Sequence, residues 1–205
     1  MDYGPWTKMN YLAHAYLSFH NPDILAGNMI SDFVKGKKQF DYPSVIQKGI
    51  RLHRDIDTFT DQHTSTKKGK EYLKPAVGAY AGAFMDVVYD HFLALDTNEF
   101  SEPGLKIFST EVYAQLYANE SVLPEKFARM LPYMSSQDWL YNYRFPEGIE
   151  KSFGGVVRRA TYLTGFGNAF DLFTGHYNEL QRCYNEFFPE VKQFASSQLA
   201  ILLNQ

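Results

Sequence analysis

Hydrophobic residues recur along this chain at the three- and four-residue spacing of an α-helix, which predicts an all-α fold. The dipeptides Asn-Gly and Asp-Gly, which favour β-hairpins, are absent. The clearest amphipathic segments predict helices over 23–36, 44–59 and 75–95. The third segment is the most apolar and begins at Pro75, a favoured first-turn residue, so we expect it at the centre of the fold.

The second half of the chain has a less regular pattern. It predicts helices at about 104–118, 124–130, 136–143 and 148–173, followed by a final pair at about 176–187 and 189–203. Pro189 is expected to divide that pair, because proline cannot continue a helix without losing a backbone hydrogen bond. No internal repeat, flexible linker or compositional shift marks a second domain, so we expect one compact helical domain.

The composition narrows the class of protein. The 205 residues are 45% hydrophobic and 17% aromatic, which excludes disordered and low-complexity chains, and the net charge of −3 does not favour a general nucleic-acid or membrane binder. Cys183 is the single cysteine, so an internal disulfide is excluded and a reducing compartment is favoured. With no long apolar run and no signal-peptide pattern, we expect a soluble, cytoplasmic protein.

Charge is distributed unevenly along the chain. The segment from Lys35 to Lys74 holds ten basic and five acidic residues, whereas the rest of the chain is acidic. Such a segment is typical of solvated helix ends joined by a lysine-rich loop. The alternative is a docking face for an acidic partner.

Acidic and imidazole side chains interrupt three apolar helix faces. His53 and Asp57 lie four residues apart in the predicted helix 44–59, Asp86 and Asp90 repeat that spacing in 75–95, and Asp32 lies on the apolar side of 23–36. A single pair of this kind is usually a buried ion pair. Three together predict a divalent metal site, since imidazole and carboxylate ligands suit Mn, Fe or Zn, and Mg when waters complete the shell. A buried ion-pair network is the alternative.

Three further histidines leave more than one interpretation open. His91 follows Asp90 and is predicted to be a ligand, a proton donor or a surface residue. His14 lies in an apolar run, which favours a hydrogen-bonded core histidine over a ligand or an acid. His63 lies just beyond the second helix and is equally compatible with a ligand and with a polar loop residue.

Four motifs in this order resemble the acyl carrier protein phosphodiesterases. They read MNYLAH at 9–14, GN and DFVKG at 27–36, GIxLHRxIDxFTD at 49–61 and DxxxDHFL at 86–93. The resemblance is thinner after Leu93, where WLxxY, RR and FFP at 139–143, 158–159 and 187–189 are similar to the family. The family is grouped with the helical HD-type phosphohydrolases, so an HD-like bundle over 9–205 is implied, with residues 1–8 as an N-terminal extension.

The resemblance implies an activity and a cofactor. The family hydrolyses the phosphodiester that joins 4′-phosphopantetheine to a serine of holo acyl carrier protein, with manganese as the favoured divalent metal. A metal held by His53 and the carboxylates would polarise a phosphoryl oxygen and activate water. Arg54 and the pair Arg158 and Arg159 are candidates to bind phosphoryl oxygens, because guanidinium groups contact them in a bidentate fork. His91 or His14 would protonate the leaving serine.

The substrate implied by the resemblance also gives the basic segment a role. Carrier proteins are strongly acidic, so Lys35, Lys37, Lys38, Lys67 and Lys68 are expected to steer docking, an effect that salt weakens. Two alternatives stay open: an HD-type phosphohydrolase of a nucleotide or other small phosphate ester, and a non-catalytic helical binding module.

Overall fold

The structure is a computed structural model that describes residues 11–101 and 103–205. Within these two ranges the chain forms helices and turns and contains no strand, which confirms the all-α prediction. None of the helices in these ranges has both the length and the apolar character needed to cross a bilayer. The predicted extension at residues 1–8 lies outside the described residues.

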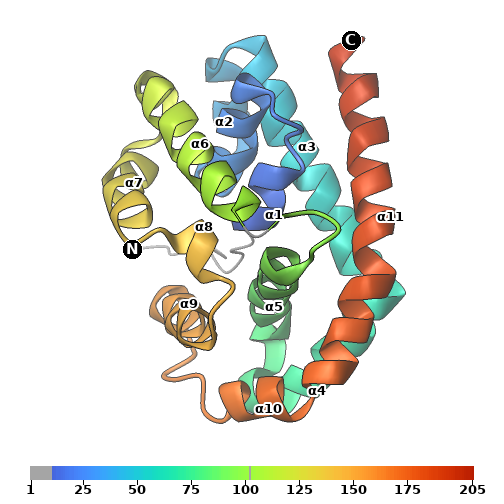
Figure 1. Ribbon diagram of the computed structural model, residues 1–205. Coiled ribbons are helices and arrows are strands. Elements are labelled where there is room, and N and C mark those ends of the chain that lie inside the picture. The colour runs from blue at the N-terminus through green and yellow to red at the C-terminus, as the bar shows by residue number, and fades with distance from the viewer. Residues whose placement is uncertain (1–10, 102) are drawn as a thin grey trace.

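The helices follow one another with short connections (Figure 1). In chain order the elements are α1 (Tyr11–Tyr16), α2 (Pro22–Ile30), η1 (Ser31–Phe33), η2 (Gly36–Asp41), α3 (Ser44–Gln62), α4 (Thr64–Val77), η3 (Gly78–Tyr80), α5 (Ala81–Leu95), α6 (Gly104–Ala118), η4 (Glu120–Val122), α7 (Glu125–Ser136), α8 (Trp139–Asn142), α9 (Pro146–Arg159), α10 (Ala169–Gly175) and α11 (Tyr177–Leu203).

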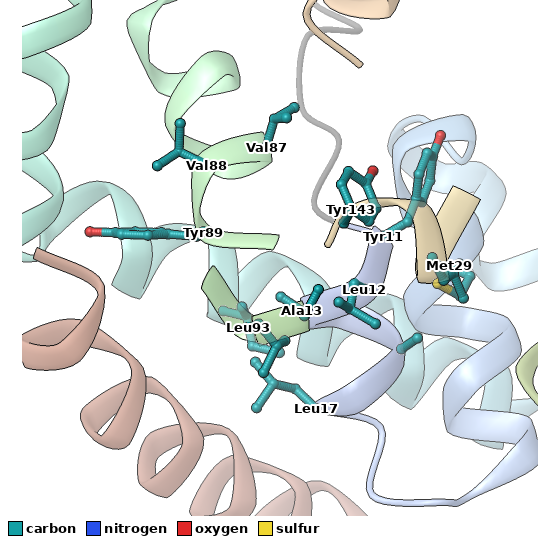
Figure 2. Packing of buried hydrophobic residues seen from close by; sticks show 14 of the residues in the cluster. Tyr11, Leu12, Ala13, Leu17, Met29, Val87, Val88, Tyr89, Leu93 and Tyr143 are labelled. Carbon is teal, nitrogen blue, oxygen red and sulfur yellow. The ribbon is translucent and has the colours of Figure 1, made fainter. Parts of the chain in front are cut away.

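Helix α5 forms the centre of the domain, as its apolar sequence predicts. Every residue from Ala83 to Ala94 is buried, and the helix packs against α1, α4, α9 and α11. Figure 1 shows α5 in the middle of the molecule, with α11 along one side. Figure 2 shows Leu12 of α1, and Leu17 just after that helix, close to Leu93 of α5. This packing fixes α1, which is only six residues long, against the buried central helix α5.

Helices α2 and α3 approach each other closely because glycine faces glycine. A Cβ atom on Gly49 would lie 2.4 Å from the backbone oxygen of Ile24 and 2.9 Å from the Cα of Gly27, closer than packed atoms tolerate. Asn21 caps the start of α2 by accepting backbone hydrogen bonds, so that end of the helix is also fixed. The close approach places the η1 residue Asp32 beside His53 of α3.

Several predicted helix boundaries were wrong. The helix predicted over 23–36 ends at Ile30 and continues only as 3₁₀ turns. The helix predicted over 75–95 begins at Ala81, because Gly78 adopts φ +54° and ends a separate helix, α4. Lys67 and Lys68 therefore lie on α4 and not in a loop. The segment predicted as one helix over 148–173 is divided into α9 and α10 by irregular backbone.

Pro189 does not divide the last helix, contrary to the prediction. Helix α11 runs through it from Tyr177 to Leu203. A proline inside a helix costs about 3 kcal/mol or more through the lost hydrogen bond and the clash with the preceding turn. Burial of Phe187, Phe188 and Val191 against the body of the domain offsets this cost.

Candidate metal centre

Two histidines from different helices stack beside one carboxylate. The rings of His14 on α1 and His53 on α3 are 3.8 Å apart between centroids and inclined by 15°. Asp57 lies one turn beyond His53, with its two oxygens 3.3 Å from His14 Nε2 and 3.5 Å from His53 Nε2. One ligand atom of each residue lies within 4.8 Å of the other two. The two rings are buried and Asp57 is partly exposed, so the cluster opens to solvent at the carboxylate.

Asn28 on α2 sets the protonation of both rings. Its Nδ2 donates to the backbone oxygen of His14 at 2.9 Å and to Ser18 Oγ at 3.1 Å, so its Oδ1 is the atom that accepts from His14 Nδ1 at 2.7 Å. Its backbone oxygen accepts from His53 Nδ1 at 2.8 Å. With a proton on each Nδ1, the Nε2 atoms of both rings face Asp57, which is the arrangement of histidines that bind a metal through Nε2.

The two imidazoles have opposite pKa shifts. Burial, together with the neighbouring His53, lowers the pKa of His14. Burial also acts to lower the pKa of His53, but the carboxylates of Asp57 and Asp32 outweigh it and raise that pKa to about 9. In the absence of a metal, His53 therefore carries a second ring proton near neutral pH, on Nε2, whereas His14 is neutral. Within the described residues neither Nε2 makes a hydrogen bond of normal geometry.

The donor set fits a divalent transition metal. Two imidazole nitrogens with unused lone pairs and one carboxylate match the ligand preference of Mn, Fe and Zn. Asp32 adds a second carboxylate at the edge, with Oδ1 3.4 Å from His53 Nε2 and a side chain that is 31% exposed. The cluster thus joins three predicted residues, Asp32, His53 and Asp57, to His14.

Asp86 and Asp90 of α5 are not among the clustered residues. Asp90 is fully buried, and its two oxygens accept the backbone N–H groups of Leu12 at 3.1 Å and Ala13 at 2.9 Å. Burial raises the pKa of Asp90 well above its usual value. Asp90 therefore provides acceptors for the free backbone N–H groups in the first turn of α1, the helix that carries His14. The small residues on the same face of α5 allow the backbone of a neighbouring helix to come this close to the carboxylate.

His91 and Arg54, both predicted to act on substrate, have structural partners. His91 Nδ1 donates to the backbone oxygen of Tyr143 at 2.7 Å, and its Nε2 accepts from the Tyr177 hydroxyl at 2.9 Å. Burial lowers the pKa of His91. The Arg54 guanidinium donates hydrogen bonds to Gln39 Oε1 and to the backbone oxygen of Val34, and these bonds hold η2 against α3.

The predicted basic residues are spread over the surface. Lys35, Lys37 and Lys38 are exposed before the start of α3, whereas Lys67 and Lys68 are exposed on α4, after its end. The five lysines therefore belong to two segments of the chain, and the first group directly follows Asp32. Arg54, in the middle of α3, donates to Gln39 and to the backbone oxygen of Val34, so the first group lies along α3 and not at its start.

The arginine pair lies at the end of α9. Arg158 is exposed and Arg159 is partly buried, and both line a cavity between α8 and α9. His63, the remaining histidine candidate, caps α4 by accepting from Ser65 N through Nδ1, and its Nε2 lies 3.3 Å from Glu190. It is not part of the cluster.

Sequence reasoning missed the bridging role of Asn28 and left His14 undecided. The available signal was a polar side chain in each of two apolar runs, at His14 in YLAHAY and at Asn28 in ILAGNMI. What the pattern lacks is the long-range packing that brings the two runs together.

Comparisons with known proteins agree with the motifs. A family model described as acyl carrier protein phosphodiesterase matches residues 9–191. A Klebsiella pneumoniae subsp. pneumoniae protein named acyl carrier protein phosphodiesterase is 31% identical over 191 residues, which cover 92% of this chain and 98% of the relative. Proteins of the same name from Enterobacter sp. (30% identical; 89% and 95% covered) and Escherichia coli O6:H1 (28%; 92% and 98%) are similarly related.

No solved structure matches this chain, so the HD-type grouping stays a prediction. The family match spans most of the chain, and its residues include every member of the cluster. The chain belongs to the acyl carrier protein phosphodiesterase family.

Proposed function

We propose that this protein is a metal-dependent phosphodiesterase that releases 4′-phosphopantetheine from holo acyl carrier protein. His14, His53 and Asp57 hold the metal. The observation that carries the proposal is the convergence of two buried Nε2 atoms, neither with a normal hydrogen bond among the described residues, on one carboxylate in a chain of this family. When bound, a divalent metal supplies Lewis-acid polarisation of a phosphoryl oxygen and favours ionisation of water near neutral pH, and Mn suits this donor set.

The residues around the cluster orient the ligands and carry out the proton transfer. Asn28 holds both rings with Nε2 facing Asp57, so the ligand geometry is preorganised. Asp32, partly exposed beside His53, orients the attacking water and accepts its proton at Oδ1. Hydrolysis adds the water oxygen to phosphorus and breaks the bond to the serine oxygen, which takes up the proton that Asp32 accepted from the water. His91 is not the donor in this scheme, because Tyr143 and Tyr177 occupy both its nitrogens.

The acidic carrier protein docks through the exposed lysines nearest to Asp32. Lys35, Lys37 and Lys38 follow Asp32 within six residues, and Arg54 fixes their segment to α3. Opposite charge on a partner raises the association rate and is screened by salt. The second group, Lys67 and Lys68, lies on α4, further from Asp32 along the chain, and contributes less to docking in this scheme.

Mass spectrometry of the carrier protein tests the activity. Purified protein with Mn and holo acyl carrier protein should lower the carrier mass by one phosphopantetheine moiety. Asp57→Asn should reduce the rate by about 100-fold or more, because loss of a ligand removes the metal. Asp55→Asn is the matched control on the same helix, since Asp55 pairs with Arg51 at the surface. It should leave the rate within about twofold.

Two outcomes would contradict the proposal. A carrier mass that stays unchanged with Mn over a range of carriers would exclude this substrate, and cleavage of a nucleotide or small phosphate ester would then favour that phosphohydrolase class. Equal activity of Asp57→Asn and wild type would exclude the assigned ligand. If Mn neither binds nor raises thermal stability, the non-catalytic binding module becomes preferable.

A further inference from the structure

A cavity of about 580 Å³ lies between α8 and α9. Its volume falls within the range of roughly 300–1,000 Å³ that small-molecule sites occupy. Trp139 and Phe145 provide apolar wall, and the glycine Gly154 leaves one face of α9 without a side chain. A Cβ atom on Gly154 would meet only Arg158 Nη1, at 3.6 Å. The cavity therefore has a gap on α9 at Gly154, and Trp139 and Phe145 form the apolar part of its wall.

The charged groups of the cavity favour an anion. Lys151, Arg158 and Arg159 line it, with Glu147 as the opposing charge. Arg159 Nη2 is buried and has no hydrogen-bond partner among the described residues. A buried guanidinium donor without an acceptor is costly, and a phosphate oxygen is the acceptor that its planar fork matches best. The inner part of the cavity is thus suited to a phosphate group.

Arg159, at the end of α9, is within electrostatic range of Asp32 beside the proposed metal centre. Asp32, which neighbours His53, acts electrostatically on both Arg159 and Tyr11. Tyr143 lines the cavity and interacts electrostatically with Arg159 and Tyr11. Figure 2 shows Tyr143 and Tyr11 next to each other, with their hydroxyls pointing the same way. A phosphate that contacts Arg159 would therefore lie at the part of the cavity that is within electrostatic range of Asp32.

We propose that this cavity receives the 4′-phosphopantetheine arm of the substrate, with Arg159 contacting a phosphate oxygen and the pantetheine chain lying along Gly154 between Trp139 and Phe145. This inference rests on the proposed function, because the arm is the group that the activity would release. The match is one of chemistry and shape: the arm carries one anionic end, followed by an extended chain of amide and methyl groups. The cavity offers both kinds of group, because the buried guanidinium nitrogen of Arg159 and the apolar side chains of Trp139 and Phe145 all line it.

Ligand binding without hydrolysis tests the inference. The probes are free 4′-phosphopantetheine and pantetheine, titrated calorimetrically into full-length protein with a chelator present, so that no phosphate–metal contact contributes. The wild-type protein should bind 4′-phosphopantetheine more tightly than pantetheine. Arg159→Ala should weaken 4′-phosphopantetheine by about tenfold or more and leave pantetheine within about twofold. Arg159→Lys, which keeps the charge without the fork, should be intermediate.

Filling the cavity gives an independent variant. Gly154→Leu places a side chain in open space and improves helix propensity, so it should fold and weaken both probes by about tenfold. Two variants away from the cavity are the matched controls. Arg182→Ala removes an exposed arginine that pairs with Glu179. Gly175→Leu adds the same side chain at an exposed helix position where no atom lies near the Cβ. Both should bind the probes as wild type does.

The results separate this inference from the proposed activity. The inference is overturned if wild type binds neither probe, or if Arg159→Ala and Gly154→Leu both keep wild-type affinity, even when holo carrier protein is cleaved normally. Arg159-dependent binding by a protein that fails to cleave holo carrier protein would instead overturn the activity and support the site.

Discussion

Replacing Asn28 with alanine tests whether α2 orients the proposed metal ligands. The side chain is fully buried and makes three hydrogen bonds, to His14 Nδ1 at 2.7 Å, to the His14 backbone oxygen at 2.9 Å and to Ser18 Oγ at 3.1 Å. The backbone oxygen that accepts from His53 Nδ1 remains in the variant. Asn28→Ala therefore releases the His14 ring and leaves the His53 ring held.

The magnitude follows from these contacts. Three hydrogen bonds at about 1 kcal/mol each give a loss of about 3 kcal/mol in the free energy of unfolding. In a chain of this size, that loss lowers the midpoint of thermal unfolding by about 6–12 °C. Removing a group that orients a metal-bound histidine typically weakens the metal by about 10–100-fold. Stability and Mn affinity should both fall.

Asn21→Ala is the matched control, because Asn21 caps the same helix from outside the site. Loss of that cap should cost about 1 kcal/mol, or about 2–4 °C, without changing Mn affinity. The assays are thermal unfolding followed by circular dichroism and calorimetric titration with Mn. If Asn28→Ala bound Mn as tightly as Asn21→Ala does, the role given to Asn28 would be refuted.

Further predictions address packing, protonation and docking. Gly49→Ala should lower the free energy of unfolding by at least about 1–3 kcal/mol, because its Cβ would lie 2.4 Å from a backbone oxygen of α2. Gly175→Ala, with nothing near its Cβ, should stay within about 0.5 kcal/mol of wild type. Equal midpoints of thermal unfolding for the two variants would contradict this. Mn binding should release the proton of His53, whose pKa is about 9, so Mn affinity should rise as pH increases towards 9. Calorimetry at pH 7 in two buffers of different ionisation enthalpy measures that proton, and identical heats would count against the exchange. Exposed Lys37 and Lys38 changed to glutamate should raise KM for holo carrier protein, leave kcat unchanged and flatten the salt dependence of kcat/KM; an unchanged salt dependence would argue against docking at η2.

Helical periodicity was sufficient to predict the fold class and part of the site. The four-residue spacing of His53 and Asp57 places both on the inner side of α3, and this local geometry survives in the structure. Helix ends that depend on one backbone conformation were harder to predict. The break between α4 and α5 depends on the positive φ of Gly78, and the continuity of α11 through Pro189 depends on packing that local propensity does not encode.

Tertiary contacts decide which acidic residues gather around the histidines. Asp57 and Asp90 both follow a polar partner by four residues on an apolar face, and the sequence pattern treats them alike. In the structure Asp57 faces the two imidazoles, whereas Asp90 accepts the backbone N–H groups of α1. Only the packing of α1 between α2 and α5 distinguishes the two. The same packing makes His14 a member of the cluster.

The most direct measurement of the metal centre is anomalous diffraction at the Mn edge from crystals grown with Mn. The account predicts one strong peak within bonding distance of His14 Nε2, His53 Nε2 and an Asp57 oxygen. A peak beside Asp86 and Asp90, or none at these three residues when Mn is bound in solution, would contradict it.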